Sequence, residues 1–450
     1  MADTPPVRQP ARWSVRLFVV ALGVLALSGA AQARPLTAAH ISGAAQARPP
    51  TAVHISGARL IGVVGRPLRL IGVNRSGTEY ACAGPVQGGG FGYGIFQGPA
   101  DAGSVRALQS WHVNAVALPL NEACWLGGYA NLDPRYSGKP YRQAIVSYVN
   151  RLAAAGIYVV LRLSGAAPGD HAYGSDQISS DEVPMADADH SIAFWSSVAS
   201  TFRDSRRVLF HTFDEPHDVS WACLRDGCTA TDSPEGQVRF GSYQTAGNQA
   251  MVDAIRATGA RQPIVISGPE FAGDLSQWER YAPKDPRHEL MADVSSFDYA
   301  DYVVGHAAAL RDFSRRHPLI VGGFGDTHCV STYSEKVMSI IDSIRQSYLA
   351  WTWDTVQDYG GCSNALLDDP GPSVNGFPAG YYSGRPSGFG RGIRAHFRRI
   401  RQTVQVRAKL PASLGKGRTG SSPAPTWETP SRSAPKRTRS PIHVGLGACR

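Results

Sequence analysis

Short apolar segments recur along the chain between residues 58 and 405, and each ends in polar or glycine residues. Their apolar character is nearly continuous rather than alternating, which is typical of strands buried on both faces of a parallel sheet. Eight such segments occur, at residues 68–77, 113–122, 158–165, 207–216, 263–270, 290–299, 319–326 and 347–354. The pattern therefore predicts eight parallel strands.

Helical periodicity fills most of the intervals between these segments. Residues 139–156 have Gly156 as a stop signal and apolar side chains at i, i+3, i+4 and i+7, namely Ile145, Tyr148, Val149 and Leu152. Eight strand–helix units predict an α/β fold, the (β/α)8 TIM barrel, and residues 59–72 predict a hairpin at its bottom. A doubly wound open sheet is the alternative, but no GxGxxG sequence follows a predicted strand.

The N-terminus has the pattern of a secretory signal peptide. Three arginines precede an apolar run, and a small-residue cleavage motif follows it. We therefore expect a signal peptide at residues 1–33 and a secreted, extracellular protein. The apolar run is too short for a convincing membrane span, although an uncleaved anchor is the alternative.

A short duplication follows the signal peptide. Residues 28–43 and 42–57 are near copies of each other, and both contain the cleavage motif. Cleavage is therefore expected after Ala33 or, alternatively, after Ala47. Two copies are too few for a solenoid, so we expect a flexible spacer at residues 34–57 before a barrel domain at residues 58–405.

Charge is distributed unevenly along the chain. The net charge is +9, yet residues 391–450 carry fourteen Lys or Arg against one acid, Glu428, so residues 1–390 have a net charge of −4. Residues 406–450 are rich in Pro, Ser, Arg and Gly, which predicts a disordered basic tail. The tail has no aromatic interleaving, so we expect no specific nucleic-acid binding; contact with nucleic acid or an anionic cell wall is the alternative to a solvated tail.

Seven cysteines in an exported chain indicate disulfides. Cys223 and Cys228 are close enough in sequence to close a small loop. The other candidate pairs fall near neighbouring strand ends, namely Cys82 with Cys124 and Cys329 with Cys362. Cys449 is left over in the tail. None of the cysteines has CxxC spacing, and no metal site is expected.

The residues that end each strand are the candidates for chemistry, because active sites of such barrels lie at the carboxyl ends of the strands. The fourth strand ends in Asp214, Glu215 and Pro216. Partial burial there would raise the pKa of a carboxyl group and suit it to general acid catalysis. A metal cluster with His211 and His217 is an alternative, but strand alternation turns Asp214 and Glu215 to opposite faces.

Aromatic and polar side chains at two other strand ends are candidates for sugar binding. Trp351 and Trp353 lie two residues apart at the end of the eighth strand. We expect the Trp353 ring to be available for stacking, with core packing as its alternative. The second strand ends in a segment that contains Asn121, Glu122 and Trp125, which are expected to line the same cleft.

Several of these segments resemble glycoside hydrolase family 5, the cellulase-like family. The resemblance covers residues 58–400 and is carried by "GVNRSGTEYAC", "NAVALPLNEACWLG", "FDEPHD", "VDAIRATGA" and "SYLAWTWD". The family consists of retaining (β/α)8 glycosidases that act on β-linked glucans, mannans and similar glycosides. The resemblance implies an acid/base glutamate after the fourth strand and a nucleophilic glutamate after the seventh, about 5–5.5 Å apart. It also implies a polysaccharide or oligosaccharide as the partner and no cofactor.

The sequence departs from the family's pattern within this one cleft. Glu215 matches the acid/base position, but the asparagine before it is Asp214 here, and the nucleophile position is Gly323. Four further polar positions are replaced: an arginine by Ala117, two histidines by Ser164 and Ser295, and a tyrosine by Phe297. Losing the nucleophile of a covalent mechanism costs many orders of magnitude in rate. The changes therefore indicate a site that lost its groups as a unit.

The first function consistent with this pattern is hydrolysis, in impaired form, of a β-linked glucan or related polysaccharide. Glu215 is the acid/base, and Asp326, on the loop after Gly323, is a candidate substitute carboxylate. Asp298 and Asp354 are further candidates near strand ends. A more distant carboxylate would activate a water molecule in an inverting geometry, at about 6.5–9.5 Å from the acid.

The second function is non-catalytic carbohydrate binding on the same barrel. Here Trp353, Trp125, Asp214 and Glu122 would bind the sugar in the old cleft. In either case we expect a monomer. A nucleic-acid-binding or wall-binding role rests on the tail alone.

Overall fold

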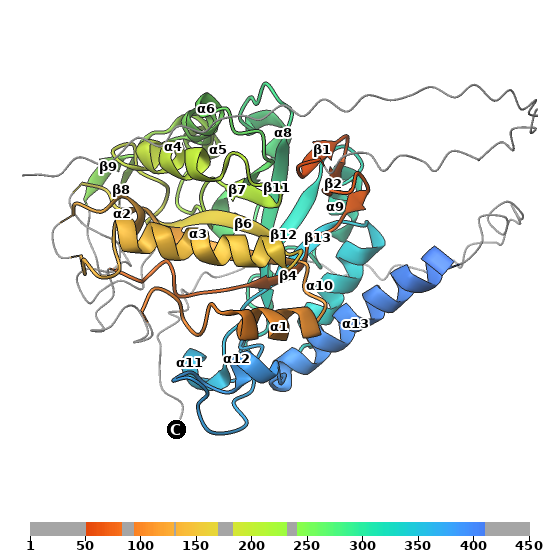
Figure 1. Ribbon diagram of the computed structural model, residues 1–450. Coiled ribbons are helices and arrows are strands. Elements are labelled where there is room, and N and C mark those ends of the chain that lie inside the picture. The colour runs from red at the N-terminus through yellow and green to blue at the C-terminus, as the bar shows by residue number, and fades with distance from the viewer. Residues whose placement is uncertain (1–50, 83–93, 130–131, 170–182, 232–240, 410–450) are drawn as a thin grey trace, which may run out of the picture. The chain divides into compact units, whose positions relative to one another are not determined.

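Eight parallel strands close into a barrel, seen at the centre of Figure 1. The computed structural model describes residues 51–82, 94–129, 132–169, 183–231 and 241–409. The barrel strands are β4 (Ile71–Asn74), β5 (Ala115–Asn121), β6 (Tyr158–Gly165), β7 (Val208–His211), β10 (Ile264–Ser267), β11 (Leu290–Phe297), β12 (Leu319–Gly325) and β13 (Ser347–Ala350). Each lies within one of the eight predicted segments, so the predicted (β/α)8 barrel is confirmed.

Helices follow most of the barrel strands and cover the outside of the barrel (Figure 1). The described helices are α1 (Ala102–Ser110), α2 (Glu122–Leu126), α3 (Lys139–Ala154), α4 (Ser191–Phe202), α5 (Trp221–Asp226), α6 (Asn248–Ala257), α7 (Pro269–Ala272), α8 (Trp278–Tyr281), α9 (Ala307–Phe313), α10 (Thr332–Ser343), α11 (Val356–Tyr359), α12 (Gly380–Ser383) and α13 (Gly388–Lys409). Helix α3 buries the four apolar side chains expected from its periodicity, Ile145, Tyr148, Val149 and Leu152. No helix in these ranges is long and apolar enough to cross a membrane.

A small antiparallel sheet closes the bottom of the barrel, as the hairpin prediction expected. Its strands are β1 (His54–Ser56), β2 (Arg59–Ile61) and β3 (Pro67–Leu68). Val53 and Leu60 of this region join one apolar cluster with side chains inside the barrel, among them Ala117, Leu209 and Ile320. Because the interior of the barrel is filled with apolar groups at this end, a polar site inside the barrel is expected at the carboxyl ends of the strands.

The boundaries of the barrel domain differ slightly from those expected. Strand β1 falls within the predicted spacer at 34–57, because its backbone pairs with β2. Helix α13 ends at Lys409, beyond the expected domain end at 405. The predicted signal peptide, both cleavage sites and residues 410–450 of the predicted tail lie outside the described residues.

Three disulfides join the cysteine pairs that the sequence suggested. They are Cys82–Cys124, Cys223–Cys228 and Cys329–Cys362. Cys329 and Cys362 lie in the loops after β12 and β13. Cys82 lies in the loop after β4, and Cys124 lies in α2, which follows β5. Two of the three disulfides therefore tie together neighbouring loops at the carboxyl end of the barrel. A third sheet in the described residues consists of two antiparallel strands, β8 (Thr229–Thr231) and β9 (Ser242–Gln244).

Candidate active site

A cavity of about 200 Å³ opens at the carboxyl ends of the barrel strands. It brings together side chains from loops that are far apart in the sequence. Its lining residues are Glu79, Tyr80, Pro119, Arg162, Ser164, Asp214, Glu215, Phe297, Tyr299, Gly323, Trp351 and Asn364. Pockets for drug-sized ligands span about 300–1,000 Å³, so this cavity suits a single sugar ring.

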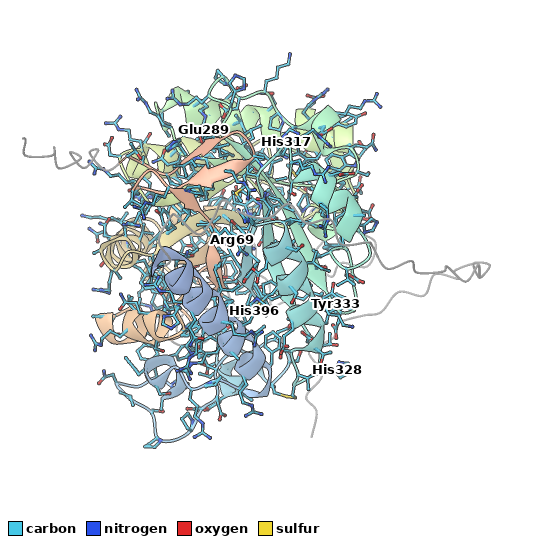
Figure 2. The ribbon with its side chains drawn as sticks, turned by 90° about the vertical axis from the view of Figure 1, so that its right-hand side faces the viewer. Arg69, Glu289, His317, His328, Tyr333 and His396 are labelled. Atoms are coloured by element: carbon cyan, nitrogen blue, oxygen red, sulfur yellow. A yellow bond between two sulfur atoms is a disulfide. The ribbon has the colours of Figure 1, made fainter. Side chains whose placement is uncertain are left out.

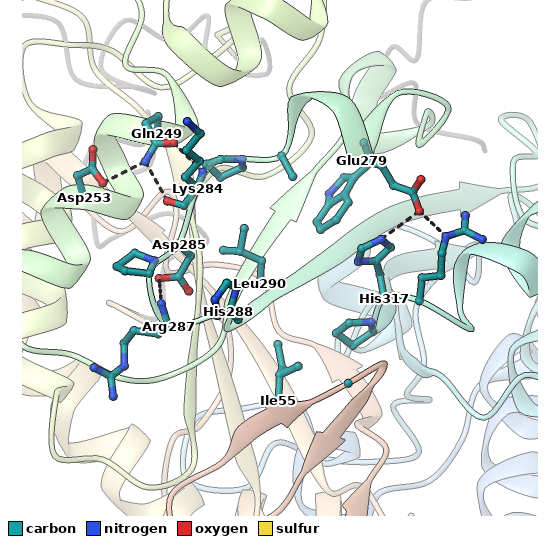
Figure 3. A pocket seen from close by; sticks show the side chains of 17 residues that line it. Ile55, Gln249, Asp253, Glu279, Lys284, Asp285, Arg287, His288, Leu290 and His317 are labelled. Atoms are coloured by element: carbon teal, nitrogen blue, oxygen red, sulfur yellow. Dashed lines mark hydrogen bonds and ion pairs between the residues drawn. The ribbon is translucent and has the colours of Figure 1, made fainter.

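A larger cavity, of about 890 Å³, lies at the opposite end of the barrel (Figure 3). It borders Leu290 at the start of β11 and Pro318 just before β12. Figure 2 shows the same separation, with His317 at one end of the molecule and His328, beyond β12, at the other. None of the predicted site residues lines this second cavity, so the smaller one is the candidate active site.

Glu215 lies in the loop after β7 with a backbone φ of 50°. A non-glycine residue in this left-handed region costs about 1–3 kcal/mol, and such residues cluster at functional sites. Burial, followed by the nearby Asp214 carboxylate, raises the pKa of Glu215 to about 8, against a hydrogen bond with Ser295 that lowers it. Glu215 is therefore protonated at neutral pH, as a general acid must be.

Arg162 occupies the centre of the site, and the sequence analysis missed it. Its Nη1 donates to both carboxylate oxygens of Asp214 at 2.7 Å, and its Nη2 donates to the Gly322 carbonyl at 3.1 Å and to Asn74 Oδ1. Ser164 Oγ donates to the same Asp214 carboxylate at 3.1 Å. Asp214 is thus the counter-charge of a buried arginine. The sequence does mark this residue, because Arg162 is the one charged side chain in the otherwise apolar segment at residues 158–165.

Gly323 lies on β12 opposite Ser295, its register partner on β11. A Cβ atom built on Gly323 would lie 3.4 Å from Ser295 Oγ and 3.7 Å from Phe297 Cζ, which are ordinary contacts. A Cβ atom therefore fits at this position, but glycine provides no carboxylate. The structure brings together Gly323, Ser295, Phe297 and Ser164, four of the positions at which the sequence departs from the family pattern.

Asp326 does not reach the cavity. Its carboxylate accepts hydrogen bonds from the backbone N–H of Tyr333 and of Ser334, each at 3.0 Å, and from Ser334 Oγ at 2.5 Å. It satisfies free N–H groups in the first turn of α10. The expected substitute carboxylate is therefore a structural residue. Its position three residues after Gly323 suggested proximity, but the chain turns away after β12.

The two alternative carboxylates also lie outside the cavity lining. Asp298 accepts hydrogen bonds from the backbone and hydroxyl of Thr327. Asp354 is buried and accepts from Ser76 Oγ at 2.7 Å. Neither side chain is placed to activate a water molecule beside Glu215.

Trp353 and Trp125 are core residues rather than stacking platforms. Trp353 is 1% exposed and packs edge-on against Trp111, with ring centroids 5.0 Å apart. Trp125 is fully buried and contacts the rings of Tyr141 and Phe194. The alternative for Trp353, core packing, is the one the structure supports.

Trp351 is the tryptophan that lines the cavity. Because Trp351 and Trp353 lie two residues apart, continued strand geometry would put both rings on the same face. Strand β13 ends at Ala350, so the alternation rule does not extend to either tryptophan. The backbone beyond the strand turns the two rings in different directions.

Glu122 is fully buried and also lies away from the cavity lining. Its carboxylate accepts from the backbone N–H of Ala167 and from Ser191 Oγ, both at 2.6 Å. Glu122, Asp187 and His190 each offer one possible metal-ligating atom, and these three atoms lie within 4.8 Å of one another. Burial, followed by the charge of Asp187, holds the pKa of Glu122 well above its usual range. Glu122 is therefore a hydrogen-bonded residue at the start of α2 and not a sugar contact.

Glu79 is the third carboxyl group that lines the cavity, beside Asp214 and Glu215, and it was not among the residues expected from the sequence. It follows β4 within the segment "SGTEYAC" and is 4% exposed. Its Oε2 accepts no hydrogen bond from the described residues. Burial, more than any other cause, raises the pKa of Glu79 to about 8. It lies within the segment "GVNRSGTEYAC" that resembles the family, but the family pattern given above assigns no catalytic role to that segment.

Comparison with known proteins decides the family. A model of the cellulases of glycosyl hydrolase family 5 matches residues 85–357, more than half of the chain. The chain belongs to glycoside hydrolase family 5. Glu215 and Gly323, which the sequence resemblance matched to the acid/base and nucleophile positions, both line the cavity described above.

Individual relatives are distant. Endoglucanase 1 of Robillarda sp. (strain Y-20) is 26% identical over 220 residues, which are 42% of this family 5 chain and 51% of that protein. The chain thus spans about half the length of this curated relative. A β-glucanase from Saccharophagus degradans is 16% identical, with 78% of this chain and 94% of that chain covered and a TM-score of 0.53. A β-mannanase from Streptomyces thermolilacinus is 19% identical, with 80% and 100% covered and a TM-score of 0.50.

Proposed function

We propose that this family 5 protein is directed at a β-linked glucan or related polysaccharide and hydrolyses it in impaired form, with Glu215 as the acid. The observation that carries the proposal is the pairing of two features in one cavity. Glu215 has its pKa raised to about 8, and Gly323 leaves β12 without a carboxylate there. The first feature supports proton donation, and the second supports the loss of the retaining mechanism.

The acid step requires a protonated carboxyl group beside the glycosidic oxygen. Glu215 is protonated at neutral pH and borders the cavity, so it would give its proton to the leaving oxygen as the bond breaks. Arg162 holds Asp214 on the floor of the site. The negative charge of Asp214 adds to the effect of burial in raising the pKa of Glu215, and the positive charge of Arg162 opposes that rise.

The choice of substrate class rests on similarity. Relatives named above are an endoglucanase, a β-glucanase and a β-mannanase, and solved complexes in the same fold hold cellotetraose or mannohexaose. Both sugars are polymers of pyranose rings. The cavity volume of about 200 Å³ supports the entry of one such ring beside Glu215.

Non-catalytic carbohydrate binding is the second candidate. It is favoured by the Arg162–Asp214 ion pair, because the two charged groups that interact with Glu215 there are already paired with each other. Under this proposal the cavity binds a sugar through Trp351 and neighbouring polar groups without breaking the chain. We further propose that the protein is secreted and monomeric; its disulfides support an oxidising compartment.

One experiment separates the two candidates. The full-length protein is incubated with soluble β-glucan and, separately, with β-mannan, and both reducing-sugar release and binding by calorimetry are measured. Binding with slow release supports the impaired hydrolase, and binding without release supports the non-catalytic alternative. Absence of both for each polymer contradicts the proposed ligand class.

Replacing Trp351 by alanine is expected to weaken oligosaccharide binding about tenfold, because the sugar loses the apolar ring that lines the cavity. Trp351→Phe keeps a flat ring and is the matched control, with a smaller loss expected. Calorimetric titration with a β-gluco-oligosaccharide measures both. An unchanged dissociation constant in Trp351→Ala would exclude a stacking role for this ring.

A further inference from the structure

Glu79 is the group in the cavity that the proposed chemistry has not yet used. The described residues leave its Oε2 without a hydrogen bond, although the side chain is 4% exposed. Burying an unpaired polar oxygen costs free energy, and buried unpaired groups in native proteins call for an explanation. A ligand or a water molecule in the adjoining cavity would supply the missing partner.

The loop that carries Glu79 is firmly held in place. Asn121 Nδ2 donates to the Glu79 carbonyl at 2.8 Å, and Tyr141 OH donates to the Thr78 carbonyl at 2.8 Å. The Cys82–Cys124 disulfide ties the same loop to α2. A carboxyl group on such a loop is pre-organised, as a catalytic group needs to be.

Barrel topology separates the loops that carry Glu79 and Glu215, although both residues line the same cavity. In the closed order, β4 lies three strands from β7 in one direction, and β12 lies three strands from β7 in the other. The loop after β4 is therefore as far round the barrel from Glu215 as the nucleophile position, Gly323, is. Arg162 lies within electrostatic range of both Glu79 and Glu215.

We propose that Glu79 is the general base of a single-displacement hydrolysis in which Glu215 is the general acid. A water oxygen bonds to the anomeric carbon while the bond from that carbon to the glycosidic oxygen breaks. The proton of the water passes to Glu79, and the proton of Glu215 passes to the leaving oxygen. No covalent intermediate forms, so the empty position at Gly323 is no obstacle. This inference rests on the proposed function.

The pH dependence follows from the protonation states that the two roles require. The reaction needs Glu79 ionised and Glu215 protonated, and burial raises the pKa of each to about 8. This form is scarce at low pH because Glu79 is protonated, and scarce at high pH because Glu215 is ionised. We expect kcat/KM for a β-gluco-oligosaccharide to peak near pH 8. An optimum in the ordinary glutamate range, about pH 4–5, contradicts the assignment.

The decisive comparison is between Glu79→Gln and Glu279→Gln in the full-length protein. Glu279 lies at the opposite end of the barrel, where it pairs with Arg316 and His317 (Figure 3), so it is a matched control. The substrate is a 2,4-dinitrophenyl β-cellobioside, whose leaving group departs without a proton from Glu215. We expect kcat to fall about 10²- to 10⁴-fold in Glu79→Gln and to stay unchanged in Glu279→Gln.

Each outcome of this comparison has one meaning. A loss confined to kcat in Glu79→Gln, with an unchanged melting temperature, supports the general base. A loss confined to KM overturns it and assigns Glu79 to sugar binding. Full activity in Glu79→Gln overturns the base role while the proposed hydrolysis stands. Oligosaccharide binding by the native protein without any aryl glycoside hydrolysis overturns both, and leaves the binding protein.

Discussion

Replacing Glu215 by glutamine lowers the expected rate of β-glucan hydrolysis by about 10²- to 10⁴-fold. Glutamine has the shape of glutamic acid but no proton to give to the leaving glycosidic oxygen. Glu215 lines the cavity and has its pKa raised to about 8, so its loss removes the acid that the native site holds ready at neutral pH. Reducing-sugar release from soluble β-glucan by the full-length protein measures the effect.

Two controls give this measurement its meaning. Glu279→Gln, a change of the same kind at the other end of the barrel, is expected to keep the native rate. The dinitrophenyl glycoside needs no acid, so Glu215→Gln is expected to retain most of its activity on that substrate. Equal β-glucan activity in the native protein and Glu215→Gln would assign the activity to a different group or a contaminating enzyme.

Replacing Arg162 by methionine is expected to lower the free energy of unfolding by about 3–5 kcal/mol. The guanidinium contacts both oxygens of Asp214 at 2.7 Å and is 4% exposed. Methionine fills similar space but leaves the Asp214 carboxylate without its counter-charge in a partly buried place. Asp293, also buried nearby, loses the positive charge that lowers its pKa. Urea denaturation followed by circular dichroism measures the change.

A matched pair of variants separates burial from charge. Arg135 pairs with Asp133 at the surface, so Arg135→Met is expected to leave the free energy of unfolding nearly unchanged. The double variant Arg162→Met/Asp214→Asn removes both charges and is expected to recover part of the stability lost in Arg162→Met. If Arg162→Met is no less stable than Arg135→Met, the buried ion pair does not organise this site.

The fold was predictable because its determinants are local and repeated. Eight nearly continuous apolar segments signal strands buried on both faces, and all eight barrel strands lie within them. Helix α3 follows its periodicity in the same way. The disulfides also followed, since strand order fixes which loops become neighbours. The boundaries of the ordered domain were less predictable. Strand β1 lies in the predicted spacer, yet it pairs with β2.

The site was predictable only where a strand end fixed the position. Glu215 and Gly323 could be placed because Gly323 lies near the end of β12 and Glu215 lies four residues after β7, and both line the cavity. Beyond the strand ends, loop backbone rather than alternation sets side-chain direction. That is why Trp353 turned out to be core and Asp326 a helix-terminal acceptor. Glu79 escaped notice because its importance depends on the cavity.

Arg162 shows how neighbouring strands can alter the centre of a site. The sequence resemblance matched the family's arginine to Ala117, which is buried in the apolar layer inside the barrel. On the adjacent strand, Arg162 pairs in register with Pro119, two residues further along β5. A guanidinium therefore remains in the cavity, but it binds Asp214 rather than a carboxylate on β12. The replacement of asparagine by Asp214 fits this new partner.

The measurement that tests the account most directly is the anomeric configuration of the first hydrolysis product. Proton NMR spectra recorded during hydrolysis of a β-linked gluco-oligosaccharide, before mutarotation, distinguish the α from the β anomer. With no carboxylate at Gly323 and water as the attacking group, the account predicts the α anomer, by inversion. A β anomer as the first product would contradict it, because retention requires a nucleophile that this site lacks.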